Sequence, residues 1–310
     1  MYLKHSLFLM LLILSACSDD QGLSFGSWTS RKDHPGTVRL DAIAFSLSGK
    51  GYWGMGMDMT SSHLRDIWSY DPKSDSWTQM KDFPFDLPAE ASVTIGNKAY
   101  VMTFSGNLYE YNPDTDSWRF LSDSPVGNRA GMTAFALGGK AYFGTGSNRD
   151  SVYFAVYKDF WEYDPSLNTW VKISDFPGAA RTDAISFVIG NKAYAGLGSN
   201  GLFAPPIFSD FWSFDSETGS WSQIQNFPEA NSLIGLSFSN NLNAYISFPG
   251  NSGLHAITYE YTATSDSWRR VKSFPSGNSL STSSFVINDR AYVIGGWGME
   301  YSPQVWEFVP

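Results

Sequence analysis

The sequence predicts an all-β protein, a six-bladed β-propeller with four antiparallel strands in each blade. The first observation is an aromatic residue followed seven positions later by Trp, five times along the chain, with a sixth pair divided between the two ends. The second is the repeat length of about 50 residues with four strand-like segments, which is typical of propeller blades. The pairs are Tyr70/Trp77, Tyr111/Trp118, Tyr163/Trp170, Phe214/Trp221, Tyr261/Trp268 and Phe308/Trp28.

Each repeat supplies its four expected strands in the same order. The first is an apolar or alternating run, as in residues 42–47, and the second carries a Tyr after a Gly-Lys or Asn-Lys turn. The third reads aromatic-x-aromatic, as in Trp68 to Tyr70, and the fourth starts at the Trp. Alternation with period two, many aromatics, and punctuation by Gly, Asn, Asp and Pro all indicate strands. The second-strand tyrosines are Tyr52, Tyr100, Tyr142, Tyr194, Tyr245 and Tyr292.

The divided sixth pair predicts how the ring closes. Six sets of first, second and third strands follow one lone fourth strand at residues 27–31. We expect this segment to pair beside residues 305–308 as the outer strand of the last blade. Such pairing covers both sheet edges without a covalent link.

The repeats resemble kelch motifs, which join a Gly-Gly pair after the second strand to a Tyr and a Trp further on. Gly295-Gly296 keeps the pair, and Gly54-x-Gly56 is a variant of it, as are Gly144-x-Gly146 and Gly196-x-Gly198. The second and fifth repeats lack the glycines, whereas every repeat keeps the aromatic and Trp part. The resemblance covers residues 27–310 and implies a single kelch propeller.

The N-terminus predicts export and lipidation. Residues 7–14 are an apolar run too short to span a bilayer as a mature helix. Leu14-Ser15-Ala16-Cys17 resembles the lipobox of bacterial lipoproteins, which implies cleavage before Cys17 and a lipid on its sulfur. We therefore expect a signal peptide at 1–16, a lipidated tether at 17–26, and a place in the bacterial cell envelope on its periplasmic or surface side. The alternative is an ordinary secretory peptide with a chance cysteine.

Composition excludes several function classes. The net charge is −9 without any Lys/Arg cluster, which disfavours nucleic-acid and anionic-membrane partners. Cys17 is the only cysteine, so the chain has no intramolecular disulfide and no thiolate metal site. His34, His63 and His255 lie in different repeats without metal-ligand spacing. We expect no metal and no cofactor, and a monomer.

Length varies in only one kind of loop. From each fourth-strand Trp to the next second-strand Tyr the spacing is 23 or 24 residues, whereas from that Tyr to the third-strand aromatic it runs from 11 to 21. Because longer loops cost closure entropy, insertions confined to one face of a repeat array indicate the binding face. Those loops are rich in aromatics, which bind ligands or pack on one another. The candidates are His63, Tyr153, Tyr157, Phe203, Phe208, Trp297 and Tyr301.

Charged residues at equivalent offsets predict a polar pit at the mouth of the central channel. They lie four and six residues past the Pro that ends each fourth strand, just before the first strands that line the channel. Arginine binds carboxylates in bidentate fashion, so the pit could hold an acidic or polyhydroxylated ligand. Alternatively, the arginines and carboxylates satisfy one another. The candidates are Arg39, Asp41, Glu90, Arg129, Arg181 and Asp183.

Two functions remain open at the level of sequence. The first is a non-catalytic module that binds a glycan or a protein, because the fold alone specifies no chemistry. The alternative comes from the resemblance, since six-bladed kelch propellers include the N-acetylneuraminate epimerases, which open a sugar ring with acid/base groups in an arginine-containing pit. In that case the arginines would hold a carboxylate and Asp41, Glu90 or Asp183 would move protons.

Overall fold

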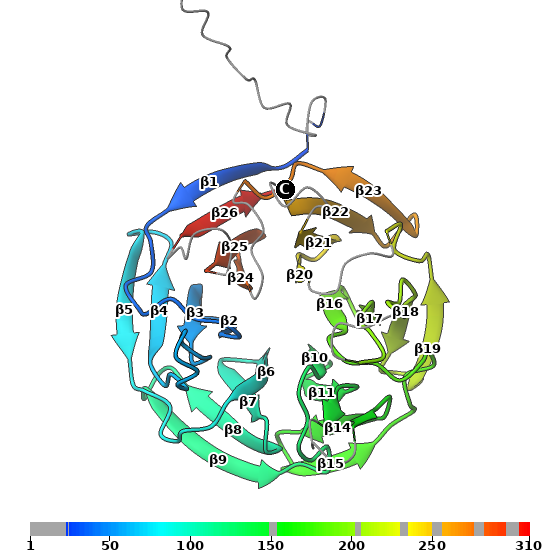
Figure 1. Ribbon diagram of the computed structural model, residues 1–310, viewed down its shortest axis with the longest axis horizontal. Coiled ribbons are helices and arrows are strands. Elements are labelled where there is room, and N and C mark those ends of the chain that lie inside the picture. The colour runs from blue at the N-terminus through cyan, green and yellow to red at the C-terminus, as the bar shows by residue number, and fades with distance from the viewer. Residues whose placement is uncertain are drawn as a thin grey trace, which may run out of the picture.

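The computed structural model shows six four-stranded sheets arranged as blades around a central channel (Figure 1). It describes residue 23 and residues 25–148, 154–201, 206–229, 235–249, 256–275, 282–295 and 304–310. Within these residues there is no helix, and hence none that could cross a bilayer. The predicted all-β propeller is confirmed.

Each blade is an antiparallel sheet whose strands follow the order predicted from the repeat, from the channel outward. Blade 1 consists of β2 (Ile43–Leu47), β3 (Lys50–Gly54), β4 (Ile67–Asp71) and β5 (Ser76–Met80). Blade 2 consists of β6 (Ala89–Ile95), β7 (Lys98–Thr103), β8 (Asn107–Asn112) and β9 (Ser117–Asp123). Blade 3 consists of β10 (Thr133–Leu137), β11 (Lys140–Gly144), β14 (Phe160–Asp164) and β15 (Thr169–Lys172). Two short strands, β12 (Ser147–Asn148) and β13 (Ala155–Val156), pair with each other in a loop of blade 3.

The remaining three blades complete the ring. Blade 4 consists of β16 (Ile185–Ile189), β17 (Lys192–Gly196), β18 (Phe211–Asp215) and β19 (Ser220–Ile224). Blade 5 consists of β20 (Leu236–Ser239), β21 (Asn243–Pro249), β22 (Ala256–Thr262) and β23 (Ser267–Val271). Blade 6 consists of β24 (Ser283–Ile287), β25 (Arg290–Ile294), β26 (Val305–Val309) and β1 (Ser27–Arg31).

The ring closes as the split repeat predicts. Strand β1 pairs antiparallel with β26 over its whole length and places Trp28 opposite Phe308. Their ring centroids lie 4.7 Å apart. Arg31 adds an ion pair to the buried Glu307, so the first and last strands are joined by backbone, aromatic and charged contacts.

The constant seven-residue step has a physical cause. The Tyr hydroxyl donates to an Asp or Asn five residues later, as Tyr111 does to Asp116 at 2.8 Å. That acceptor has a positive φ, 44° in Asp116, a conformation that Asp and Asn adopt more readily than most residues. Two residues further on, the indole N–H of Trp118 donates to the carbonyl of Lys81, which follows the outer strand of the preceding blade. The step therefore sets both the turn and the bond to the neighbouring blade.

Hydroxyl side chains join the innermost strands around the channel. Ser46 of β2 donates to the carbonyl of Val286 on β24, and Ser92 of β6 donates to the carbonyl of Ala44 on β2. Thr133 of β10 does the same toward Ala184. These bonds satisfy carbonyls on the inner sheet edges and give the channel a polar wall.

Candidate functional site

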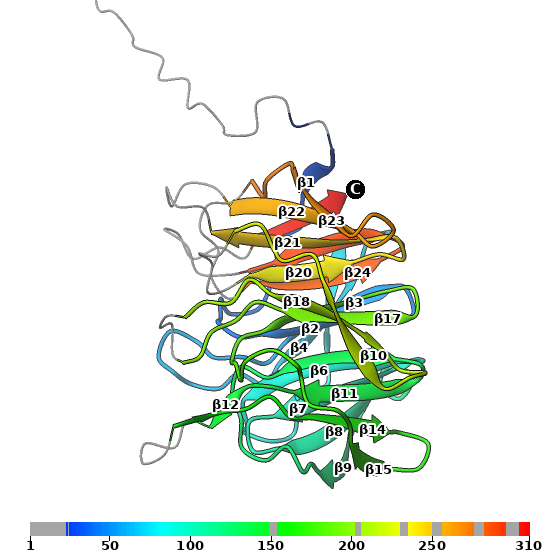
Figure 2. The same cartoon turned by 90° about the vertical axis from the view of Figure 1, so that its right-hand side faces the viewer.

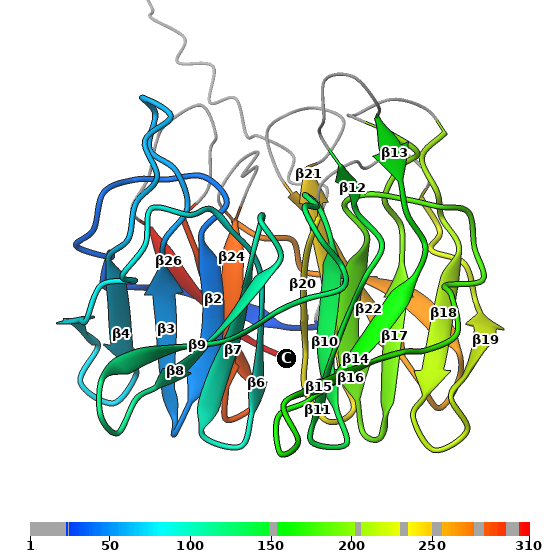
Figure 3. The same ribbon diagram turned by 90° about the horizontal axis from the view of Figure 1, so that it is seen from below.

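The loops of variable length and the connections between blades lie at one face of the disc (Figures 2 and 3). We call this the loop face, and the opposite one, with the short hairpin turns, the turn face. In three blades the long loop extends the sheet past its last regular pair, through the bridges Leu40–Met57, Ala130–Ser147 and Thr182–Ser199. The roots of these loops are therefore ordered backbone.

A buried arginine fixes the loop root in blade 1. The two terminal nitrogens of Arg39 each donate to one carboxylate oxygen of Asp66, both at 2.7 Å, in bidentate geometry. Arg39 also donates to the carbonyls of Thr37 and Met55. Asp66 accepts a further bond at 2.6 Å from the indole N–H of Trp68 on β4. The arginine thus joins the segment before β2 to both ends of the long loop.

Blades 3 and 4 repeat this unit, which we call the Arg–Asp–Trp triplet. Arg129 and Arg181 bind Asp159 and Asp210 in the same bidentate way, and each donates to the carbonyl that follows the second strand of its own blade. The tryptophan of each triplet donates to the same carboxylate from two residues along the chain; these are Trp161 at 2.8 Å and Trp212 at 2.8 Å.

Aromatic rings cover the faces of the three guanidinium groups. The guanidinium carbon of Arg39 lies 4.5 Å from the ring centroid of Trp53, and that of Arg129 lies 3.9 Å from Tyr157. Arg181 lies between two rings, Phe176 at 4.5 Å and Phe208 at 4.4 Å. These distances are within the range of cation–π attraction, which is stronger away from water.

The electrostatics keep each triplet charged. Burial alone would raise the pKa of Asp66, but the hydrogen bonds and charge of Arg39, with the bond from Trp68, outweigh it and hold the pKa below its ordinary value. The same balance lowers the pKa of Asp159 beside Arg129 and of Asp210 beside Arg181. Each pair is therefore an ionised, hydrogen-bonded contact inside its blade.

The channel mouth carries the carboxylates that the offsets singled out. Asp41 is exposed there, and Glu90 accepts a bond at 3.1 Å from the backbone N–H of Gly131 in the next blade. The backbone N–H of Asp183 in turn donates to the carbonyl of Gly131 at 2.8 Å. The structure thus brings Glu90 and Asp183 together across blades 2, 3 and 4, whereas the arginines lie within their blades with Asp66, Asp159 and Asp210 as partners.

Comparison with known proteins agrees with the propeller fold. The model of the kelch motif matches residues 52–84. A protein of Vibrio cholerae described as a kelch domain-containing protein is 35% identical over 106 residues, which cover 33% of this chain and 27% of the relative. The solved structure of YjhT has a TM-score of 0.69, covers 90% of this chain and 96% of that one, and is 19% identical, so it shows the fold. This chain is a kelch-repeat β-propeller.

Two further relatives of the kelch propeller carry the name N-acetylneuraminate epimerase. The one from Vibrio vulnificus is 28% identical over 132 residues, 41% of this chain and 33% of the relative. The one from Vibrio cholerae is 32% identical over 131 residues, 41% of this chain and 32% of the relative. The aligned part thus spans about a third of the curated relatives' own length or less.

Of the remaining predicted candidates, the structure describes His63, Tyr157 and Phe208. His63 is exposed on the long loop of blade 1, with Nδ1 3.4 Å from a carboxylate oxygen of Asp86 in the next connection. Tyr157 and Phe208 pack on the arginines of the triplets. The others lie outside the described residues of the kelch propeller: Cys17, Tyr153, Phe203, Trp297 and Tyr301.

His34 is a buried group that the sequence did not single out for a role. It occupies the position before a Pro that Phe83, Phe176 and Phe227 hold in other blades of the kelch propeller. Its ring lies tilted against that of Trp53, with centroids 4.0 Å apart, and neither ring nitrogen has a hydrogen-bond partner. Burial, with the nearby charge of Arg39, lowers its pKa to about 4. Neutral His34 therefore serves as an aromatic packing group.

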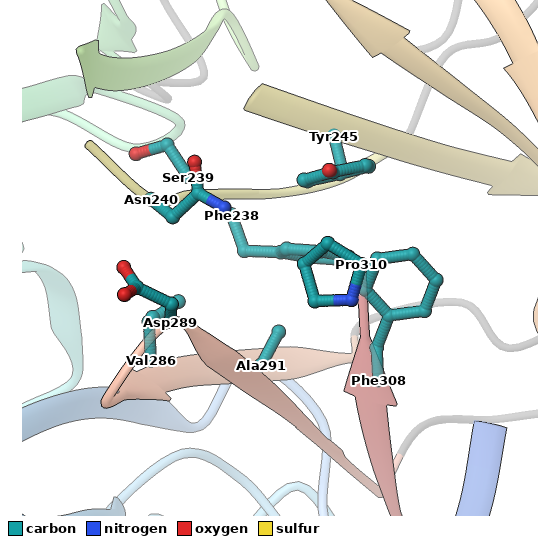
Figure 4. Close-up of a pocket in the computed structure, with 9 residues that line it drawn as sticks. All are labelled: Phe238, Ser239, Asn240, Tyr245, Val286, Asp289, Ala291, Phe308 and Pro310. Atoms are coloured by element: carbon teal, nitrogen blue, oxygen red, sulfur yellow. The ribbon is translucent and has the colours of Figure 1, made fainter. Parts of the chain in front are cut away.

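The described residues contain no group of three or more His, Asp or Glu side chains placed to hold a metal ion. A hollow lies between blades 5 and 6 on the turn face, lined by Phe238, Tyr245, Asp289, Phe308 and Pro310 among others (Figure 4). It encloses no space large enough for a water molecule. This hollow is therefore a packing gap of the closing seam and no candidate site.

The aspartates of the triplets were missed at the level of sequence, although the sequence contains a signal for them. Asp stands two residues before the third-strand Trp in Asp66-Ile-Trp68, Asp159-Phe-Trp161 and Asp210-Phe-Trp212. These are the same three repeats that carry the arginine. The occurrence of this Asp and of the arginine in the same three repeats is the sequence signal that pairs each aspartate with its arginine.

Proposed function

We propose that this kelch propeller is a non-catalytic binding module that engages a glycan or a protein through its loop face. The proposal rests on one observation: chain length varies in a single loop type, and the Arg–Asp–Trp triplets fix the roots of three long loops. A rigid root under a variable tip is the arrangement expected where specificity resides in loops carried by a fixed scaffold.

Exposed apolar side chains at the loop tips support this function. Met59 in blade 1 is 49% exposed and Phe154 in blade 3 is 47% exposed. Phe154 reaches toward Gly201 of the blade 4 loop, where a Cβ atom would lie 3.4 Å from its ring. The loops of blades 3 and 4 thus meet at an exposed aromatic ring, which suits sugar rings and protein side chains alike.

A glycan array and an affinity capture experiment test the proposal. We expect wild-type protein to bind a defined glycan or partner, and Phe154→Ala to weaken that binding at least tenfold. Leu167→Ala is the matched control, because Leu167 is 70% exposed on the hairpin turn between β14 and β15 of the same blade. Equal binding by the two variants would remove the loop face from the proposal.

A second candidate is an N-acetylneuraminate epimerase-like activity, favoured by the names of two relatives. The carboxylates at the channel mouth, Glu90 and Asp183, are then the groups to move protons. Following a freshly dissolved anomer of N-acetylneuraminate by NMR decides between the two functions. Faster anomer exchange with protein supports the epimerase, and unchanged exchange supports the binding module.

We further propose that the module is lipid-anchored in the bacterial envelope through Cys17, on the basis of Leu14-Ser15-Ala16-Cys17. Mass spectrometry of the mature N-terminus should find a diacylglycerol-modified Cys17. Replacement by Cys17→Ser should release the protein from the membrane fraction. An unmodified N-terminus in the wild-type protein would contradict the anchor.

A further inference from the structure

An aromatic cluster is exposed on blade 2, whose outer strand is β9 (Figure 1). Phe85 is 45% exposed and Phe120 is 49% exposed. Tyr109 lies between them, with ring centroids 5.3 Å from Phe85 and 5.5 Å from Phe120. Phe83 packs beneath, 5.0 Å from Tyr109, so the exposed rings rest on a rigid aromatic base.

The cluster departs from the repeat on the outer strand. In every blade the first aromatic of the third strand faces a residue of the fourth strand. In blade 2 that residue is Phe120, opposite Tyr109. In the other five blades it is polar: Gln79, Lys172, Gln223, Arg270 and Ser30. Since polar side chains serve the scaffold equally well here, folding does not require an exposed Phe at this position.

Phe85 departs from the repeat independently, in the connection between blades 1 and 2. The equivalent position, directly after the Pro that follows each fourth strand, holds Gly36, Val126, Gly178 and Glu229 in four other connections. In blade 5 this residue, Glu229, accepts a bond at 2.7 Å from Tyr259, the counterpart of Tyr109. Where blade 5 has this polar contact, blade 2 has a second exposed ring.

The short loop of blade 2 leaves this surface uncovered. Its β7–β8 connection consists only of residues 104–106, whereas blades 1, 3 and 4 have long loops at this point. The polar groups at the edge are an amide and a carboxylate, Asn107 and Asp123, whose side chains are bonded at 2.6 Å. Both offer further lone pairs or N–H groups to hydroxyls.

The size of the cluster selects a small ligand. A buried aromatic side chain covers about 150–250 Å², so two half-exposed rings offer on the order of 200 Å². A stable protein interface needs roughly 800 Å² on each partner. Two sugar rings, by contrast, match two aromatic faces in area.

The charge of the surroundings selects a neutral ligand. Asp123 at the edge is exposed, and Asp86, next to Phe85, has a side chain that is 77% exposed. The neighbouring cation on β9, Arg119, is bound to Glu110 at 3.2 Å. Carboxylates disfavour an anionic ligand and accept hydrogen bonds from sugar hydroxyls.

We infer that Phe85, Tyr109 and Phe120 form a platform for a neutral oligosaccharide, whose sugar rings stack on Phe85 and Phe120 and whose hydroxyls bond to Asn107 and Asp123. The inference rests on the proposed binding function and names the ligand class and the place on the molecule.

Isothermal titration with cellohexaose, xylohexaose, mannohexaose and laminarihexaose tests the platform. We expect one or more of these neutral chains to bind wild-type protein, and hexagalacturonate, which is anionic, to bind at least tenfold more weakly. Phe120→Gln installs the residue of blades 1 and 4, and Phe85→Gly that of Gly36 and Gly178. Each should weaken binding at least tenfold with an unchanged melting temperature.

Val171→Gln is the matched control, since Val171 is 56% exposed on the outer strand of blade 3. It should bind the same oligosaccharide as wild type does. Wild-type affinity in Phe120→Gln and Phe85→Gly would overturn the platform while leaving the binding function in place. Failure of all four neutral chains to bind would also overturn it, and the binding function would then depend on the capture experiment and the loop-face variant Phe154→Ala.

Discussion

Blade 2 shares its backbone scaffold with blades 1, 3 and 4 but differs from them at the loop face. The first three have long loops whose roots are fixed by the Arg–Asp–Trp triplets. In blade 2, Pro88 stands at the arginine position and Asn107 at the aspartate position, and the loop is the shortest. The charged unit is therefore not needed to form a blade. It accompanies a long loop in blades 1, 3 and 4, and blade 2, which lacks it, has an exposed aromatic surface.

This difference separates two uses of similar residues. Arg39, Arg129 and Arg181 are enclosed by protein groups and stabilise the loop roots. Phe120, by contrast, is exposed where the other five blades have polar residues, and Phe85 is exposed where four other connections have Gly, Val or Glu. Regularly repeated polar residues thus indicate structure in this molecule. The irregular apolar ones indicate binding.

The comparison presupposes a closed ring, and removing the closing strand should have the largest effect. Deleting residues 27–31 exposes the edge of β26 and removes the contacts of Trp28 and Arg31. We expect loss of the cooperative unfolding transition, measured by circular dichroism on heating. A melting curve like that of the wild type would show that blade 6 is stable with three strands.

Breaking one triplet tests whether the arginine is structural. Arg181→Ala leaves Asp210 partly buried without its cation, so the free energy of unfolding should fall by about 3–5 kcal/mol. Pro88→Ala, at the same position in blade 2, is the control and should change it far less. Urea denaturation measures both. An Arg181→Ala protein of unchanged stability that lost ligand binding would instead assign this arginine to the ligand.

His34 gives the comparison a pH dependence. Its pKa in the folded state is about 4, below the ordinary value of about 6.5, so folding favours the neutral ring. The contribution of His34 to the free energy of unfolding is intact above pH 6.5. It is progressively lost as the pH falls toward 4, by at most about 3 kcal/mol. His34→Phe, the residue of other blades, should remove this loss.

The measurement is urea denaturation of wild type and His34→Phe between pH 7 and pH 4. The charged groups facing His34 are Arg39 and Asp66, and they remain in the variant. Because the pKa of Asp66 is lowered, its own contribution is lost only as the pH falls below the ordinary range of aspartate. Parallel pH profiles of the two proteins would contradict the role given to His34.

The smallest expected effect is on the stability of the platform variant. Phe120→Gln introduces at an exposed position the residue that Gln79 and Gln223 provide in blades 1 and 4. We expect a change in the free energy of unfolding of less than about 0.5 kcal/mol. A loss above about 2 kcal/mol would show that Phe120 serves packing, and would end the distinction drawn for blade 2.

The fold followed from the sequence because each repeat encodes its own contacts. The step from Tyr111 to Trp118 fixes a turn and a bond to the preceding blade, and the split pair of Phe308 and Trp28 fixes closure. The arginines were found by their offsets, but their partners were not, because side-chain direction across the loop root does not show in spacing along the chain.

The platform could not be predicted from spacing either. In strand alternation, Phe120 looks like an ordinary apolar position, and its exposure depends on the short loop and on the connection that carries Phe85. Only the cross-strand register, which places Phe120 where other blades have polar residues, makes the departure visible.

The central claim is that a neutral oligosaccharide binds where blade 2 departs from the repeat. A crystal structure of the protein with the neutral hexasaccharide that binds best tests it most directly. The account predicts sugar rings stacked on Phe85 and Phe120, with hydroxyls near Asn107 and Asp123. Sugar bound instead at the channel mouth, against Asp41, Glu90 or Asp183, would contradict it.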